Sequence, residues 1–477
     1  MKITLIYPGE LSLSSALYPP LGLSYIASYV EQAGFKVKII DTIFQKIEDI
    51  EIDGDKNIYG IYTATPIHFK GIELAKKIKK MDKNAVVVFG GPHPTILPEE
   101  TIKAGADIVV IGEGEEAFLS IVRAINTNKK LDDISGIVFR KYGKIIKTPP
   151  KHFIENLDKL PFPDQSKFPI EKYFKLKGFR EISMITSRGC PMNCIFCQPT
   201  LRKLFGNTVR YRSPKNIVDE IEYLVKNFKP DMIVFSDDTF CSKEQNIIEV
   251  CNLIIKRKID VLWRCQTRVG LKKETLRLMK KAGCFLLALE VESGSQKILN
   301  NIRKGITPNQ IIETFILCKK VGILTHAYFM VGNIGETFET IDDSKKLMSK
   351  IKPFNISVAI VTPYPGTDLY EFALKNNLLL ETNWDQFCHV QNKPTLKIDG
   401  LTKKEIIAIK NDFLEQHKKS VNSKIKDLSF SLKDLIFIRK IFRIALKDKN
   451  IIKRIFLLSF KSIKSTGFSI SNPYKNS

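Results

Sequence analysis

Short runs of Val and Ile alternate, along the first 126 residues, with stretches whose apolar positions recur at helical spacing. The apolar runs predict strands at residues 3–7, 37–41, 58–62, 85–89 and 107–111. The stretches between them predict helices at residues 21–33, 70–81, 99–104 and 115–126. Nearly continuous apolar strands separated by helices are typical of a parallel sheet covered on both faces. The pattern therefore predicts a Rossmann-like, doubly wound parallel sheet, which we assign to residues 1–128.

A second alternation of strands and helices runs from about residue 181 to residue 380. Its apolar runs predict six strands, at residues 182–186, 232–235, 261–268, 285–290, 326–332 and 356–360. Polar residues follow these runs, at the end of the strands where βα-barrels build their active sites. The pattern predicts a partial, TIM-like (β/α)6 barrel over residues 181–380.

The two predicted domains are joined by residues 129–180, and a helical region follows at residues 381–477. The joining segment predicts a β-hairpin with its turn at Tyr142 and Gly143. It also contains the sequence Leu-Pro-Phe-Pro-Asp at residues 160–164, whose prolines stiffen the chain. This stretch is either a spacer that holds two domains face to face or an ordinary surface linker.

Charge is spread unevenly over the 477 residues, which carry a formal net charge of +24. Between residues 421 and 477 there are 13 Lys and Arg against 3 Asp, so this segment alone carries 13 − 3 = +10. Within it, residues 432–460 interleave Leu, Ile and Phe with basic residues, a composition that suits helices lying on an anionic membrane. The alternative is helices packed on the barrel with a solvated basic face. No stacking motif supports a nucleic-acid partner.

Composition otherwise indicates a globular protein of the cytoplasm or of the inner membrane face. No run of 18 apolar residues is present, and the first residues are typical of a strand rather than of a signal peptide. The 9 cysteines are an odd number with no regular spacing, which argues against a disulfide framework. We expect six of them to be small core residues, namely Cys241, Cys251, Cys265, Cys284, Cys318 and Cys388.

Cys190, Cys194 and Cys197 form a C-x3-C-x2-C motif directly after the first predicted barrel strand. Three thiolates on one [4Fe–4S] cluster leave one iron open to a small molecule. A structural zinc site would need a fourth ligand, usually from a second C-x2-C pair, which the sequence lacks. Ferredoxins use the different spacing C-x2-C-x2-C. The motif therefore favours a metal centre with one open position.

The motif resembles the cluster loop of the radical S-adenosylmethionine (SAM) enzymes, and the resemblance extends over the whole predicted barrel. It implies that the open iron binds SAM and that Phe196 lies beside the adenine. It further implies SAM contacts from the residues that follow the barrel strands, namely Glu292, Ser293, Gly335 and Asp237, with Asp238 near SAM or the substrate. Asp237 has the alternative role of a helix cap. Asn333 and Ile334 depart from the Leu-Pro that the family places before Gly-Glu-Thr.

The first domain resembles the cobalamin-binding domain that is fused to one large class of these enzymes. The similar motifs are Pro-Pro-x-Gly at residues 19–22, Gly-Gly-x-His at residues 90–93 and Gly-Glu-Gly-Glu at residues 112–115. The resemblance implies cobalamin contacts from Gly91, His93, Gly112 and Gly114. The Asp-x-His-x-x-Gly sequence of mutase-type cobalamin domains is absent. A Rossmann-like domain that no longer holds a corrin is the alternative.

Together these resemblances imply a cobalamin-dependent radical SAM methyltransferase that acts at an unactivated carbon. They also imply a small-molecule or lipid substrate and an electron donor such as flavodoxin or ferredoxin. The cofactors carry the reaction, so we assign no catalytic side chain. One alternative is a ring-closing or rearranging enzyme without methyl transfer, similar to the anaerobic cyclases of tetrapyrrole synthesis. The other is a corrin-binding or scaffold protein that is not an enzyme.

Overall fold

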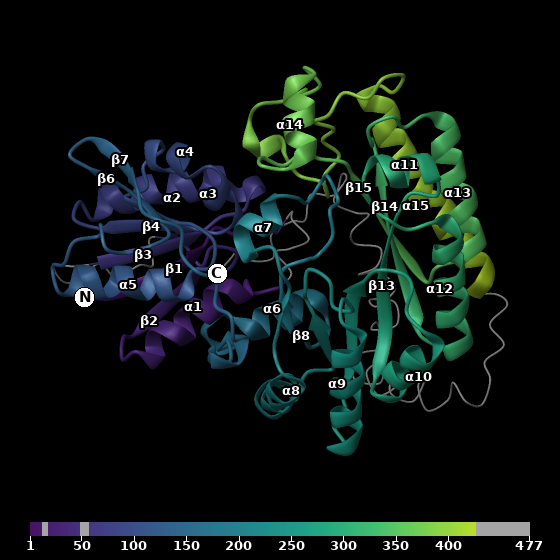
Figure 1. The fold of residues 1–477 in the computed structure, drawn as a ribbon, viewed down its shortest axis with the longest axis horizontal. Helices are drawn as coiled ribbons and strands as arrows, with labels where there is room; N and C mark the ends of the chain where they lie inside the picture. The colour runs from purple at the N-terminus through teal and green to yellow at the C-terminus, as the bar shows by residue number, and fades with distance from the viewer. Residues whose placement is uncertain (12–17, 48–56, 426–477) are drawn as a thin grey trace, which may run out of the picture.

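The computed structural model describes residues 1–11, 18–47 and 57–425, which form two α/β units side by side (Figure 1). The N-terminal unit is purple and blue in Figure 1, and the second unit is teal and green. Among the helices in these ranges, none has both the length and the apolar character needed to cross a membrane. The basic stretch 432–460, and with it the predicted membrane contact, lies outside the described residues.

The N-terminal unit contains a seven-stranded sheet in the order β2-β1-β3-β4-β5-β6-β7. The predicted strands and helices are confirmed. Neighbouring strands among the first five pair in parallel, whereas β6 and β7 pair antiparallel and extend the sheet beyond β5. The hairpin that we expected in the joining segment is therefore part of this sheet. The strands are β1 (Lys2–Tyr7), β2 (Val37–Asp41), β3 (Asn57–Tyr62), β4 (Val86–Gly90), β5 (Ile108–Val110), β6 (Ile137–Lys141) and β7 (Lys144–Lys147).

Helices cover both faces of this sheet because its strands bury side chains in both directions. Along β1, Ile3 and Leu5 join the core formed with α1 and α5, whereas Ile6 joins the core formed with α2. This alternation is the strand period of two, and it gives the doubly wound arrangement. The helices are α1 (Leu21–Gln32), α2 (His68–Met81), α3 (Pro92–Ile96), α4 (Pro98–Lys103) and α5 (Glu115–Asn126), with a 3-10 turn η3 (Thr65–Ile67) before α2.

The second unit is an open barrel of six parallel strands in the order β15-β14-β13-β12-β11-β8, as predicted. The strands are β8 (Glu181–Met184), β11 (Met232–Phe235), β12 (Leu262–Thr267), β13 (Cys284–Glu292), β14 (Leu324–Val331) and β15 (Asn355–Ile360). The helices are α8 (Pro214–Phe228), α9 (Glu244–Lys256), α10 (Lys273–Lys281), α11 (Gln296–Asn301), α12 (Pro308–Val321), α13 (Phe338–Ile351) and α14 (Asp368–Lys375). The long α15 (Lys403–Ile425) packs on β15 and β14.

Between the units, the Leu-Pro-Phe-Pro-Asp stretch is packed rather than displayed on the surface. The Asp164 backbone N–H donates to Ser28 Oγ in α1 at 2.9 Å, and Gln165 Nε2 donates to the Ser183 carbonyl in β8 at 2.8 Å. These contacts favour the spacer over the surface linker. The flanking elements are η4 (Leu157–Lys159), η5 (Gln165–Lys167) and α6 (Ile170–Lys177), the last of which the sequence pattern did not predict.

Candidate functional site

The three cysteines of the motif lie on a loop held against the open end of the barrel. The loop follows the short strand β9 (Ser187–Arg188), which pairs with β10 (Arg210–Tyr211), and leads into α7 (Thr200–Phe205). Ile195 is fixed from both sides: its N–H donates to the Ile302 carbonyl at 3.3 Å, and its carbonyl accepts from Leu369 N–H at 3.0 Å. Backbone contacts to the segments after β13 and β15 therefore set the position of the thiols.

The three thiols are shielded from solvent to different degrees. Cys194 is buried, and Cys190 and Cys197 are partly exposed. A tetrahedral zinc ion would hold its sulfur ligands about 3.8 Å apart. Over the described residues, the group of possible ligand atoms within 4.8 Å of one another does not include these thiols. The three sulfur atoms therefore do not all lie within 4.8 Å of one another.

Asp237 and Asp238, at the end of β11, fix the chain just before the first cysteine. Asp237 Oδ1 accepts hydrogen bonds from the backbone and hydroxyl of Thr186, at 2.8 and 2.9 Å, and of Ser187, at 2.6 and 2.7 Å. Asp238 Oδ2 accepts from Gly189 N–H at 3.0 Å. Burial raises the pKa of Asp237 to about 6, although the four hydrogen bonds oppose this shift. Asp237 thus organises the cluster loop, and it is not the cap of the next helix.

Glu292 and Phe196 come together around Lys304. Lys304 Nζ lies 2.8 Å from Glu292 Oε1 and 2.5 Å from Glu290 Oε2, and it is 5.9 Å from the Phe196 ring centroid. The Lys304 side chain is 1% exposed. The register of β13 shifts between Glu290 and Glu292, and Glu292 has φ +62°, so both carboxylates face the same ammonium. Sequence reasoning missed Lys304, because nothing distinguishes it from the chain's other basic residues.

Arg264 and Arg268 both contact other groups of the protein. Arg264 Nε lies 2.6 Å from Glu181 Oε1, and its Nη2 donates to the Tyr18 hydroxyl at 2.5 Å. Arg268 donates to the carbonyl of Lys304. Burial would raise the pKa of Glu181, but Arg264 and Lys177 outweigh it and hold that pKa at about 2. Arg264 therefore forms an ion pair with the buried Glu181.

Ser293 and Gly335 lie in the loops after β13 and β14. Ser293 is fully buried, with its Oγ 3.1 Å from Ser344 Oγ in α13. Gly335 has φ +78°, and a Cβ there would lie 2.9 Å from Asn301 Nδ2, so the turn requires glycine. The departure at Asn333 is accommodated, since its N–H donates to Glu336 Oε2 at 3.1 Å. Burial raises the pKa of Glu336 to about 7.

The Gly-Glu-Gly-Glu motif of the first unit contacts the cluster loop of the second. Arg188, two residues before Cys190, places Nη1 2.7 Å from Glu113 Oε1 and Nη2 2.5 Å from Glu115 Oε1. All three side chains are at most 7% exposed. A Cβ at Gly112 would lie 3.4 Å from the Leu204 carbonyl of α7, so the two units are in close contact here. Gly114 instead lies against Ile26 of α1.

Gly91 and His93 directly follow β4 and lie at the edge of the sheet formed by the carboxyl ends of its parallel strands. Gly91 has φ +105°, and a Cβ there would lie 2.7 Å from the Thr63 carbonyl. The neighbouring Gly90 has no heavy atom within 4 Å of its Cβ position, so this edge leaves open space. The His93 side chain itself is fully buried, between His68 and Trp384. Burial lowers the pKa of His68 to about 3.

Five of the remaining six cysteines are buried core residues, as expected, and the sixth packs against the core. Cys241 is partly exposed, and the other five are buried. Four of them lie on β12, β13, α9 and α12, Cys241 precedes α9, and Cys388 lies in the segment between α14 and α15.

The sequence patterns of two families match the chain, each on the expected unit. The Radical SAM superfamily matches residues 184–348. The B12 binding domain matches residues 14–122. The two expected domains are therefore found in the expected order.

Two curated relatives match most of the chain. The uncharacterized methyltransferase PH0819 of Pyrococcus horikoshii is 35% identical, over 85% of this chain and 90% of the relative. The anaerobic magnesium-protoporphyrin IX monomethyl ester cyclase of Rubrivivax gelatinosus is 31% identical, over 78% of this chain and 70% of the relative. Among solved structures, the radical SAM methyltransferase TsrM of Kitasatospora setae has the same fold, with a TM-score of 0.68 at 18% identity, covering 80% of this chain and 77% of TsrM.

Proposed function

The chain belongs to the radical SAM superfamily, among the members that also carry a B12-binding domain, and on this premise we propose that it transfers a methyl group from SAM to an unactivated carbon of a small-molecule or lipid substrate. Its cofactors are a [4Fe–4S] cluster, SAM and cobalamin. When bound, the cluster supplies the electron that cleaves SAM, and cobalamin carries the methyl group.

The cluster loop has the donor set that this cofactor needs. Cys190, Cys194 and Cys197 would each provide one thiolate, and five of the other six cysteines are buried in the core. Asp237 and Asp238 hold the chain before Cys190 with five hydrogen bonds, which keeps the loop in place. In our proposal these residues position the cluster at the open end of the barrel.

Lys304, Glu290 and Glu292 are suited to hold SAM beside that loop. The Lys304 ammonium offers positive charge to the carboxylate of the SAM amino-acid group, and Glu292 offers a carboxylate to its ribose hydroxyls. Phe196 supplies an aromatic ring for the adenine. Because these groups are buried, their charges act in a weakly screening environment, and the enclosed site would keep water away from a reactive species.

The observation that carries the proposal is the contact between Glu113 and Arg188. It joins the B12-binding unit to the residue two places before the first cluster cysteine. For cobalamin, the open space at Gly90, together with the close backbone approach at Gly91, fits a bulky ligand at this edge of the sheet. A protein that uses both cofactors on one substrate needs the two sites held at a fixed separation, which this buried contact provides.

A second candidate is ring closure or rearrangement without methyl transfer. The cyclase of Rubrivivax gelatinosus is 31% identical to this chain. The relatives of the chain therefore include proteins named as methyltransferases and proteins named as cyclases. The residues that would hold the cofactors serve either reaction, and the two candidates differ in the fate of the methyl group of SAM.

For both candidates we propose a reducing compartment and an electron donor such as flavodoxin or ferredoxin. Free thiols and an iron–sulfur cluster persist in the cytoplasm, where thiols are kept reduced. A lipid substrate would place the protein at the inner membrane face.

One incubation separates the candidates. The protein is purified without oxygen, reconstituted with iron, sulfide and cobalamin, and tested for corrin absorbance. It is then given a low-potential reductant, SAM with a deuterated methyl group, and small-molecule and lipid extracts of cells. We expect a reductant-dependent product that has gained the labelled methyl group. A product that forms without the label overturns methyl transfer and supports the cyclase candidate.

A further inference from the structure

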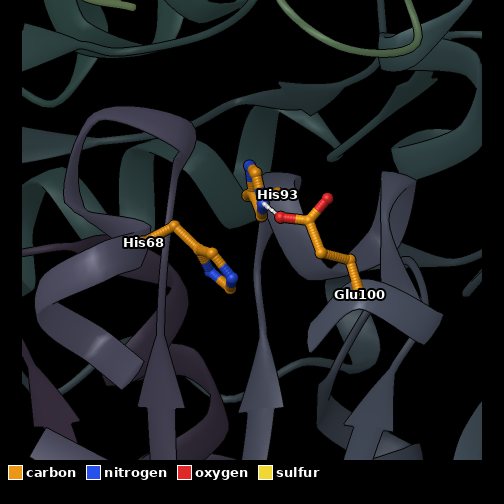
Figure 2. Close-up of side chains that lie close together, drawn as sticks. All are labelled: His68, His93 and Glu100. Carbon is orange, nitrogen blue, oxygen red and sulfur yellow. Dashed lines mark ion pairs between the residues drawn. The ribbon is translucent and has the colours of Figure 1, made fainter. Parts of the chain in front are cut away.

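A second group of metal-ligating side chains lies away from the cluster loop, at the carboxyl ends of β3 and β4. His68 begins α2, His93 lies in α3 and Glu100 lies in α4, and Figure 2 shows the three side chains close together. One possible ligand atom from each residue lies within 4.8 Å of the other two. The B12-binding unit thus brings two imidazoles and a carboxylate to one place.

In each imidazole one ring nitrogen makes a hydrogen bond and the other makes none. His68 Nδ1 is 3.1 Å from Thr63 Oγ1, and His93 Nδ1 is 3.2 Å from Thr65 Oγ1. The Nε2 atoms of both rings are buried and make no hydrogen bond. Buried polar atoms without partners are rare and costly in folded proteins. Metal-binding histidines characteristically use their second ring nitrogen in a hydrogen bond of this kind.

Glu100 is partly exposed to solvent, and it contacts both His93 and the segment after the barrel. Its side chain is 46% exposed, and its Oε1 lies 3.8 Å from His93 Nε2. The same oxygen accepts a hydrogen bond from Trp384 Nε1 at 2.7 Å. The Trp384 ring also meets the edge of His93, with 5.6 Å between centroids. Glu100 is therefore the solvent-exposed member of the group, and the Trp384 ring packs on one side of it.

We propose that His68, His93 and Glu100 bind one divalent transition-metal ion. Two imidazoles and a carboxylate are a ligand set that zinc and its neighbours accept, with a water completing the coordination. These side chains lie at the same edge of the sheet as Gly90 and Gly91, and the ion would bind to them without cobalamin or SAM.

Binding requires a small local change. Ligand atoms around tetrahedral zinc lie about 3.4 Å apart, so the widest separation must shorten by up to about 1.4 Å. The two rings are now stacked, with centroids 3.9 Å apart and planes at 27°, and must turn so that both Nε2 atoms face one point. The half-exposed Glu100 can follow by side-chain rotation. The ion would link α2, α3 and α4, and through Glu100 it would act on the Trp384 segment.

Cobalt(II) is the probe, because its spectrum distinguishes nitrogen and oxygen ligands from thiolates. The test uses the full chain with Cys190, Cys194 and Cys197 all changed to Ala, which removes the competing cluster motif. We expect one cobalt per chain, without thiolate charge transfer, and its displacement by zinc. Glu100→Gln should weaken binding at least tenfold, and His93→Gln should weaken it further. His152→Ala changes an exposed histidine and should leave binding unaltered.

The surface position of Glu100 keeps the test valid if His93→Gln does not fold. Zinc should raise the Tm of the parent chain and not that of Glu100→Gln. Cobalt binding that is the same in Glu100→Gln as in the parent overturns the proposal. So does a thiolate charge-transfer band, or the absence of any saturable cobalt binding by a folded parent chain.

Discussion

Arg188 and Glu113 form a buried ion pair between the two units, with 2.7 Å between Nη1 and Oε1. The residues are 75 positions apart in the sequence, and Glu115 and Arg210 complete the network around them. Because Arg188 is two residues before Cys190, the pair ties the cluster loop to the B12-binding unit. The Arg188 guanidinium carbon also lies 5.2 Å from the centroid of the Tyr25 ring, which adds a cation–π contact.

Removal of one partner of this pair should destabilise the protein strongly. Glu113→Gln leaves the Arg188 charge buried with one carboxylate fewer, and breaking a buried pair typically costs about 3–5 kcal/mol. Denaturant unfolding should show this loss. Lys346→Ala breaks the exposed pair with Asp342 and should change the free energy of unfolding by less than about 1 kcal/mol. Equal effects of the two substitutions would contradict the role given to Glu113.

Cys194→Ala should abolish the cluster. The loop then offers two thiolates, and bound iron and sulfide should fall to background after anaerobic reconstitution. Formation of 5′-deoxyadenosine from SAM should stop with it. The matched control is Cys251→Ala, which truncates a buried core thiol in α9 and should keep both signals. Retention of iron by the Cys194 variant would mean that another residue completes the site.

Lys304→Met should weaken SAM binding and destabilise the apoprotein. The substitution leaves Glu290 and Glu292 facing each other without a cation, which costs several kcal/mol in a buried site. Equilibrium dialysis of labelled SAM with the reconstituted protein measures the first effect. Lys319→Met, on the exposed face of α12, is the control. If SAM binds both variants alike, Lys304 holds only the fold.

The stability of the apoprotein should fall as the pH rises through the range set by Glu336. Burial raises the pKa of this carboxyl to about 7, above its value of 4.5 in the unfolded chain. The folded state therefore keeps the proton that the unfolded state loses. The retained proton on Glu336 contributes about 3 kcal/mol to the free energy of unfolding below pH 4.5, and this contribution is lost by about pH 7. Glu336→Gln should remove this part of the pH dependence in denaturant unfolding, whereas an unchanged profile would contradict the shift.

The elements with strong periodicity could be predicted from the sequence. The Val- and Ile-rich strands of both units are where the apolar runs placed them, and Ser213 caps α8 with Pro214 following it. Local rules suffice for these features because burial and capping act over a few residues. The cysteine spacing also carries its meaning locally.

Contacts between distant residues could not be read from any pattern. Lys304 is one of many basic residues until β13 and its bulge bring two carboxylates to it. Asp237 has the sequence context of a helix cap, yet the neighbouring strand gives it the backbone of Thr186 and Ser187. His68 and His93 stack only because β3 and β4 are adjacent in the sheet.

The central claim is that three cysteines hold a [4Fe–4S] cluster whose open iron binds and cleaves SAM. The most direct test is iron, sulfide and 5′-deoxyadenosine analysis of the protein reconstituted without oxygen and supplied with reductant and SAM. We expect about four iron and four sulfide per chain, with 5′-deoxyadenosine formed only when both reductant and SAM are present. Zinc in place of iron, or a fully assembled cluster that leaves SAM intact under reduction, would contradict it.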